Sequence, residues 1–196
     1  MKSILLALLT ALPLSQAAGQ GRITPAGVAR AQAVVDSVYL DRKIPTGFIE
    51  GGDWASYLMV RVGVNPLPDS VGLVVAVDSH VVTFSGRIQD LPPEAQAMLG
   101  PLGALIDPAT VLSAEVVLLP AAQGLAHFQL RRVKVGAFPV PETMLRSMMF
   151  DVGDRYPALT KTGRDLFVQI PADGKVELLP GAVRISVSRS PGESKP

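Results

Sequence analysis

Alternation between apolar and polar side chains is the feature that most constrains how this chain can fold. Val82 and Phe84 share one parity, and Thr83 and Ser85 share the other. A period of two with one polar side is typical of antiparallel strands that pack one face on a core. The same period predicts strands at residues 57–64, 73–77, 80–88, 112–119, 125–136, 166–170, 176–178 and 183–187.

The alternation changes phase within the longest of these segments. Phe128 and Leu130 share one parity, whereas Val133 and Val135 occupy the opposite one. A slip of one residue is typical of a β-bulge, which bends a strand and increases its twist. The sequence therefore predicts a bulge around residues 131–132.

Three segments carry helix signals. Thr24 suits an N-cap and Pro25 suits the first helical turn, so a helix is expected to begin there. Residues 91–107 have one apolar stripe, interrupted by an internal proline that would kink or split a helix. A third helix is expected to begin at Pro141. By contrast, residues 43–54 are rich in turn formers and are expected to form a loop.

These elements predict the fold class. Six to eight antiparallel strands and two or three helices, without an internal repeat, indicate one α+β domain. We place this domain at residues 24–188. The tail 189–196 is small and polar, and we expect it to be disordered.

The first residues predict the compartment. Residues 4–14 are apolar, Lys2 precedes them, and Ser15 and Ala17 are small residues at the positions that a signal peptidase reads. This stretch is shorter than the about 20 residues of a membrane-spanning helix. We therefore expect a cleavable signal peptide at residues 1–17, no transmembrane helix in the mature chain, and a secreted or periplasmic protein of the cell envelope.

Composition narrows the chemistry of an exported chain. There is no cysteine, so disulfides, thiol lipidation and covalent haem are excluded. Loss of Lys2 with the signal leaves 18 − 1 = 17 basic residues against 17 acidic ones. A chain this close to neutral has no basic field to attract nucleic acid, and we expect no nucleic-acid partner.

Convergent catalytic groups are not evident in the sequence. His80 and His127 fall in separate predicted strands, and neither has further ligands at metal-binding spacing. Asp151 and Asp154 lack the later oxygen ligands of a calcium loop. We expect no cofactor, no metal and no enzymatic activity. An enzyme with dispersed polar residues is the alternative, which a cleft gathering His127, Asp151 and the arginines at 131–132 would indicate.

A methionine-rich stripe follows the strand at 125–136. Met144, Leu145, Met148, Met149 and Val152 recur at positions i, i+1, i+4, i+5 and i+8, which is one face of a helix. Such a stripe most often fills an irregular part of a core. It also suits the wall of a pocket, because unbranched thioether side chains repack around variable apolar ligands.

The run VKVGAFPVPETMLRSMM, residues 133–149, resembles the strand, V-G-x-x-P-x-P, helix junction of the YpmS-like family of uncharacterised bacterial envelope proteins. A looser similarity extends over residues 108–188. These proteins look related to the tubular lipid-binding (TULIP) superfamily. The resemblance implies a highly curved antiparallel sheet that wraps a helix and encloses an apolar groove. This chain departs from the pattern in its cleavable signal and its short or proline-broken helices.

The resulting hypothesis is an exported, non-catalytic protein that binds a lipid or another apolar small molecule. Arginines at 131–132 either form a solvated face or, under this hypothesis, meet an anionic head group. The alternative is a structural or interaction module of the cell envelope that meets a protein partner at a sheet edge or at residues 43–54. The expected pocket residues are Phe138, Met144, Leu145, Met148 and Met149, with Met98, Leu102 and Phe128 as weaker candidates.

Overall fold

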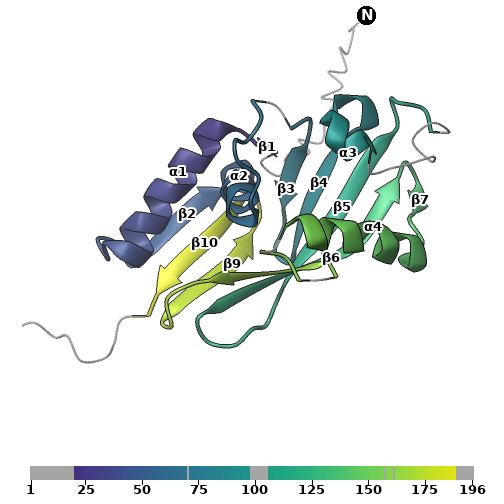
Figure 1. Ribbon diagram of the computed structural model, residues 1–196. Coiled ribbons are helices and arrows are strands. Elements are labelled where there is room, and N and C mark those ends of the chain that lie inside the picture. The colour runs from purple at the N-terminus through teal and green to yellow at the C-terminus, as the bar shows by residue number, and fades with distance from the viewer. Residues whose placement is uncertain (1–19, 70, 98–105, 157, 161, 189–196) are drawn as a thin grey trace, which may run out of the picture.

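Two antiparallel sheets form the framework of the protein in a computed structural model, which describes residues 20–69, 71–97, 106–156, 158–160 and 162–188. The larger sheet has seven strands in the order β1-β3-β4-β5-β6-β7, with β8 also paired to β6 (Figure 1). Its strands are β1 (Gly21–Arg22), β3 (Val74–Val77), β4 (Val81–Arg87), β5 (Val111–Leu119), β6 (Leu125–Val135), β7 (Phe138–Pro139) and β8 (Asp165–Gln169).

The smaller sheet pairs an early strand with the last two strands of the described chain. Its order is β2 (Thr46–Glu50), β10 (Ala182–Val187) and β9 (Gly174–Leu179). The sheets meet where the backbone of Gly181 donates a hydrogen bond of 2.9 Å to the carbonyl of Val77. The predicted α+β class with antiparallel sheets is confirmed. The described strands number ten rather than six to eight, because β1 and β7 are two-residue strands and β2 was not anticipated.

The predicted bulge lies at its expected place. Glu115 of β5 is opposite Arg132, and Val116 is opposite Leu130, so Arg131 is the additional residue on β6. The parity change therefore keeps Leu130 and Val133 on the same face of the sheet. The prediction from the phase of the alternation is confirmed.

Strand β6 is shared by several neighbours. Along one edge it pairs with β5, and along the other it pairs first with β8 and then with β7. Between its segments paired with β8 and β7, the β6 backbone has other hydrogen-bond partners. The Leu130 amide donates to the carbonyl of Arg164 at 2.8 Å, and the Val133 carbonyl accepts from the Val140 amide at 2.8 Å. The long strand thus organises most of the large sheet.

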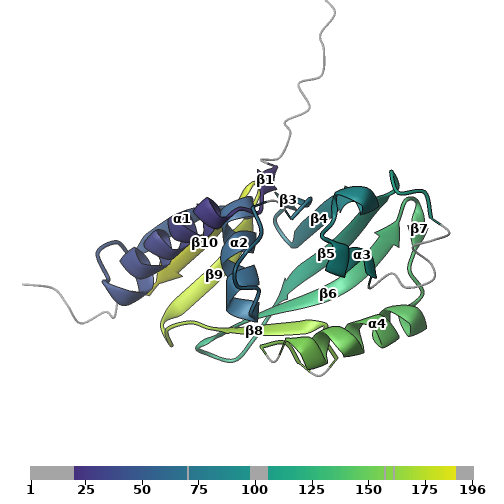
Figure 2. The same cartoon turned by 45° about the horizontal axis from the view of Figure 1, so that its top comes forward.

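Helices cover one side of this framework. The described helical elements are α1 (Pro25–Val35), its π-helical continuation η1 (Asp36–Leu40), α2 (Gly51–Val62), the 3-10 turn η2 (Ile88–Asp90), α3 (Pro93–Ala97) and α4 (Glu142–Arg155). Helix α1 lies on the small sheet, α2 contacts strands of both sheets, and α4 runs along β6 and β8 (Figure 2). The Thr24 side chain accepts a 3.0 Å hydrogen bond from the Gly27 amide, which confirms the predicted cap.

Two predictions for residues 43–64 were wrong. The expected loop at 43–54 contains β2 and the start of α2, and the expected strand at 57–64 is mostly α2. Residues 58–64 are almost all apolar, so their alternation with a period of two carried little information. Gly51 and Gly52 allow close packing and do not form a loop. A Cβ on Gly52 would lie 2.7 Å from the backbone nitrogen of Arg22, so glycine allows the helix to begin directly against β1.

The predicted helix at 91–107 is described only in part. Residues Pro93–Ala97 form α3, and the predicted stripe residues Met98 and Leu102 lie outside the described part of the chain. The helix predicted from Pro141 is confirmed as α4, with Pro141 at the N-cap position.

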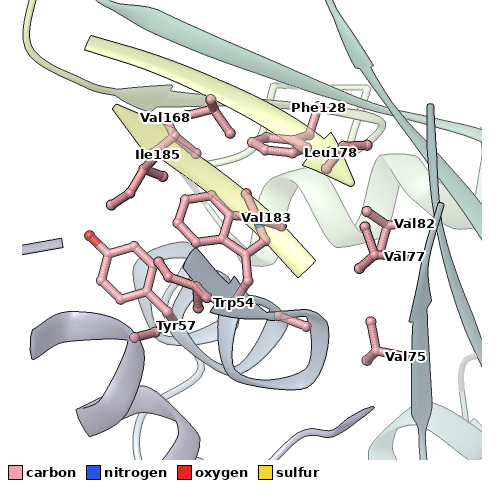
Figure 3. Close-up of a cluster of buried hydrophobic side chains, with 14 of the residues drawn as sticks. Trp54, Tyr57, Val75, Val77, Val82, Phe128, Val168, Leu178, Val183 and Ile185 are labelled. Atoms are coloured by element: carbon pink, nitrogen blue, oxygen red, sulfur yellow. The ribbon is translucent and has the colours of Figure 1, made fainter. Parts of the chain in front are cut away.

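The core lies where α2 meets both sheets. Trp54 occupies its centre, between Tyr57 on the same helix and Phe128 on β6 (Figure 3). The ring centroid of Trp54 is 5.6 Å from that of Tyr57 and 6.2 Å from that of Phe128. Val183 and Ile185 of β10 are fully buried beside this aromatic group. Helix α2 therefore holds the two sheets together through one continuous apolar cluster.

Candidate ligand-binding cavity

A cavity of about 740 Å³ lies between α2, α4 and the inner face of the large sheet. This volume is within the range of about 300–1,000 Å³ that is typical of small-molecule sites. Most of the side chains around it are apolar. The apolar lining residues include Trp54, Leu58, Met59, Val62, Val71, Leu73, Val82, Phe84, Leu91, Val116, Phe128, Leu130, Met149, Val152, Leu159 and Leu166.

Strand register explains the floor of the cavity. Val82 on β4 is opposite Val116 on β5, and Val116 is opposite Leu130 on β6. One cross-strand row of three branched side chains therefore spans the sheet. Phe128 and Leu166 are opposite each other on β6 and β8 and line the cavity beside this row.

Helix α2 provides one wall. Trp54, Ala55, Leu58, Met59 and Val62 line the cavity. They recur at i, i+1, i+4, i+5 and i+8, which is the spacing of a single helical face. This is the same spacing that the sequence shows at residues 144–152. The sequence contains this helical spacing, but residues 57–64 were predicted to be a strand because their apolar residues also fit a period of two.

Helix α4 provides the opposite wall through its second half. Met149, Val152 and Arg155 line the cavity, and the chain that follows α4 adds Tyr156, Leu159 and further residues. Gly163 holds this returning segment against the helix. Its φ is +66°, and a Cβ there would lie 1.9 Å from the carbonyl oxygen of Met149. Only glycine combines this conformation with so close an approach.

Only some of the predicted pocket residues line the cavity. Phe128 and Met149 both line the cavity, whereas the other described candidates are absent from its lining. Leu145 is buried, Met148 is half-buried, and Met144 is 37% exposed. Phe138 is 78% exposed on β7. Met98 and Leu102 lie outside the described residues.

Charged side chains lie at the boundary of the cavity. Among the described residues that line it, the charged ones are Arg155 and Arg164. Arg164 is held in place, because its Nη2 donates to the carbonyl of Leu130 at 3.0 Å and its Nη1 is ion-paired with Glu142. Arg155 ends α4 and is exposed. Both charges are positive, and the described lining has no acidic side chain.

A second polar cluster lies on the other face of the sheet. His127 and Phe128 are neighbours on β6 and therefore point to opposite faces. His127 Nε2 lies 2.8 Å from Asp165 Oδ1, and Gln129 Nε2 donates to the same oxygen at 2.9 Å. Partial burial opposes ionisation of Asp165, but the hydrogen bonds from His127 and Gln129 outweigh it and lower its pKa. The ring of His127 also stacks on Phe167 at 4.3 Å.

The arginines at the bulge do not line the cavity. Arg131 and Arg132 are exposed, and Arg132 Nη1 lies 3.8 Å from Glu115. His80 is exposed at the β3–β4 turn and lines a separate recess of about 370 Å³. Within the described ranges, which omit residues 70, 98–105, 157 and 161, no group of three or more His, Cys, Asp or Glu would hold a metal ion.

None of the described helices is long and apolar enough to cross a membrane. No family model, no curated protein and no solved structure matches this chain.

Proposed function

We propose that this chain is a non-catalytic protein that binds a lipid or another apolar small molecule in the cavity between α2, α4 and the large sheet. The observation that carries the proposal is the cavity itself, with about 740 Å³ bounded mainly by aliphatic and aromatic side chains. An apolar surface of this extent that is partly open to solvent is stabilised when an apolar ligand covers it. Burial of each methylene of such a ligand contributes about 0.8 kcal/mol before ordering costs are subtracted.

The walls are suited to variable apolar ligands. Met59 on α2 and Met149 on α4 face the same cavity from two helices. Flexible thioether side chains can adjust to acyl chains of different shape. The methionine stripe of α4 thus contributes to the proposed site through one of its three methionines.

The proposal includes the compartment and the kinship expected from the sequence. The apolar N-terminal stretch supports an exported protein of the cell envelope. An antiparallel sheet covered on one side by helices supports kinship with YpmS-like proteins and the TULIP superfamily, as does the helix after the V-G-x-x-P-x-P junction.

Titration with fatty acids, followed by the fluorescence of Trp54, tests this function. Trp54 is the one tryptophan of the chain and lies in the cavity wall, so its emission is expected to change when a ligand enters. Met149→Asp places a carboxylate in the cavity and is expected to weaken binding at least tenfold, because burial of a charge beside an acyl chain is unfavourable.

Met144→Asp is the matched control, since Met144 lies on the same helix but is exposed and outside the lining. Met149→Phe fills part of the cavity without a charge, and it is expected to lower the maximal chain length bound. Unchanged affinity in folded Met149→Asp and Met149→Phe proteins would contradict the assignment of the cavity.

An interaction module is the second candidate. Phe138 lies on β7, the last strand in the order of the large sheet, and is 78% exposed. Exposed apolar side chains at a sheet edge are typical of contact surfaces. A protein that takes up no fatty acid or phospholipid, and that carries none when purified from its own envelope, would favour this candidate.

A further inference from the structure

Resting on the proposed function, we infer that the ligand is an amphiphile with an anionic head group, such as a long-chain carboxylate, and that Arg155 binds this head group. The acyl chain then extends from the mouth of the cavity toward Trp54 and Phe128. The inference comes from the sign and position of the charges around the cavity, and from its volume.

The charges of the lining favour an anion. Arg155 and Arg164 are the charged residues among the described lining residues, and no acidic side chain is present to balance them there. Arg164 already has a carboxylate partner in Glu142 and a carbonyl partner in Leu130. Arg155 is the exposed one of the two, so it is the cation placed to meet a ligand at the mouth.

Arg155 is both exposed and part of the lining, so we place the mouth beside it, where the C-terminal ends of α2 and α4 approach each other. Gly63 ends α2, and a Cβ at Gly63 would lie 3.8 Å from Cδ1 of Tyr156, which directly follows Arg155. Asn65 and Tyr156 line the cavity at this end and add side-chain hydrogen-bonding groups beside the guanidinium. Deeper lining residues on β4, β5 and β6 are apolar, so a polar head group finds its partners at the mouth and a chain finds its partners inside.

The volume is sufficient for an acyl chain. A water molecule occupies about 30 Å³ in the liquid, and a methylene is similar, so the carbons of dodecanoate need roughly 360 Å³. The cavity of about 740 Å³ accommodates such a chain.

Arg155 has a structural role that the experiment must separate from ligand binding. A cation in the last turn of a helix interacts favourably with the helix dipole, whether or not a ligand is present. Arg155→Gln therefore changes both the helix and the mouth. The comparison of two ligands of equal chain length, dodecanoate and dodecanol, isolates the contribution of the charge.

The experiment measures the affinity of each ligand for the wild-type protein and for three variants by Trp54 fluorescence and calorimetry. Arg155→Gln is expected to weaken dodecanoate binding about fivefold and to leave dodecanol binding unchanged, as expected for one partly exposed ion pair. Arg155→Lys keeps the charge and is expected to stay within about twofold. Arg146→Gln is the control, because Arg146 is exposed on the same helix and does not line the cavity. Added salt is expected to weaken dodecanoate binding only.

The outcomes separate the two proposals. In one outcome, both ligands bind the wild-type protein while Arg155→Gln weakens the two affinities equally or changes neither of them. Binding of an anionic head group by Arg155 is then refuted, and the apolar site is retained. If neither dodecanoate nor dodecanol binds the wild-type protein, the proposed function fails, and the inference about the head group fails with it.

Discussion

Replacement of Trp54 by phenylalanine is expected to leave the stability of the protein nearly unchanged. Trp54 is 2% exposed, and its indole Nε1 is buried without a hydrogen-bond partner among the described residues. A buried unpaired donor costs about 1–3 kcal/mol, and Trp54→Phe removes it. Aromatic side chains bury about 150–250 Å², so the smaller ring forfeits on the order of 50 Å², or about 1.3 kcal/mol. The two effects largely offset each other, and the net change lies between a loss of about 0.3 and a gain of about 1.7 kcal/mol.

Trp54→Ala is the matched comparison. It removes the same N–H, but it also removes the aromatic contacts of Trp54 with Tyr57 and Phe128 and enlarges the cavity. We expect a loss of about 3 kcal/mol, at the lower end of values for a buried aromatic residue, because the unpaired donor is removed as well. Urea unfolding followed by far-ultraviolet circular dichroism measures both variants without the lost fluorophore. Equal destabilisation by the two substitutions would refute the argument, since it would mean that the indole nitrogen contributes a favourable interaction.

Two further predictions concern the segment that follows α4 and the outer face of the sheet. Gly163→Ala is expected to destabilise the protein by about 2 kcal/mol or more and to weaken ligand binding, because its Cβ would collide with the Met149 carbonyl. Gly136→Ala is the comparison, since Gly136 has a similar φ of +60° but its Cβ would make an ordinary contact at 3.5 Å. Thermal unfolding should show a loss of stability of only about 1 kcal/mol for Gly136→Ala. Equal losses would contradict the role of the collision. Asp165→Ala is expected to cost about 1–2 kcal/mol at neutral pH. Because the pKa of Asp165 is lowered by folding, this stabilisation is present above the unfolded value of about 3.9 and is lost as the pH falls through the folded value. Urea titrations at several pH values check this, and a difference between wild-type and variant that persists at the lowest pH would count against it.

The local sequence predicted most of the large sheet. The strands β4, β9 and β10 alternate in sequence, because one face of each packs on the core and the other is more exposed. Even the bulge at Arg131 was predictable from parity alone. The sequence was uninformative at α2, where a run of apolar residues satisfies both a period of two and a helical period. Tertiary packing decides such a segment, since α2 touches both sheets.

The site was predicted less completely than the fold. Methionines on α4 and Phe128 were recognisable as candidates, and Phe128 and Met149 line the cavity. Its other wall belongs to α2, whose residues were predicted to be part of a loop and part of a strand, so Trp54 and Leu58 were not candidates for the site. The mouth depends on Arg155 and Tyr156, which lie beyond the stripe and have no distinctive local pattern. Their position follows from the turn after α4, and long-range packing of this kind leaves little trace in sequence periodicity.

The pairing of β2 with β10 sets the order in which the chain can acquire its structure. Thr46 pairs with Ser186 and Glu50 pairs with Ala182, so the second strand of the fold gains its partner from the last one. During synthesis, β2 and the apolar face of α2 therefore emerge well before the strands that cover them. Contacts of such long sequence separation close slowly, and the exposed intermediate is prone to aggregate. Truncation just before β10 would remove the central strand of the small sheet and leave β2 and β9 without their shared partner.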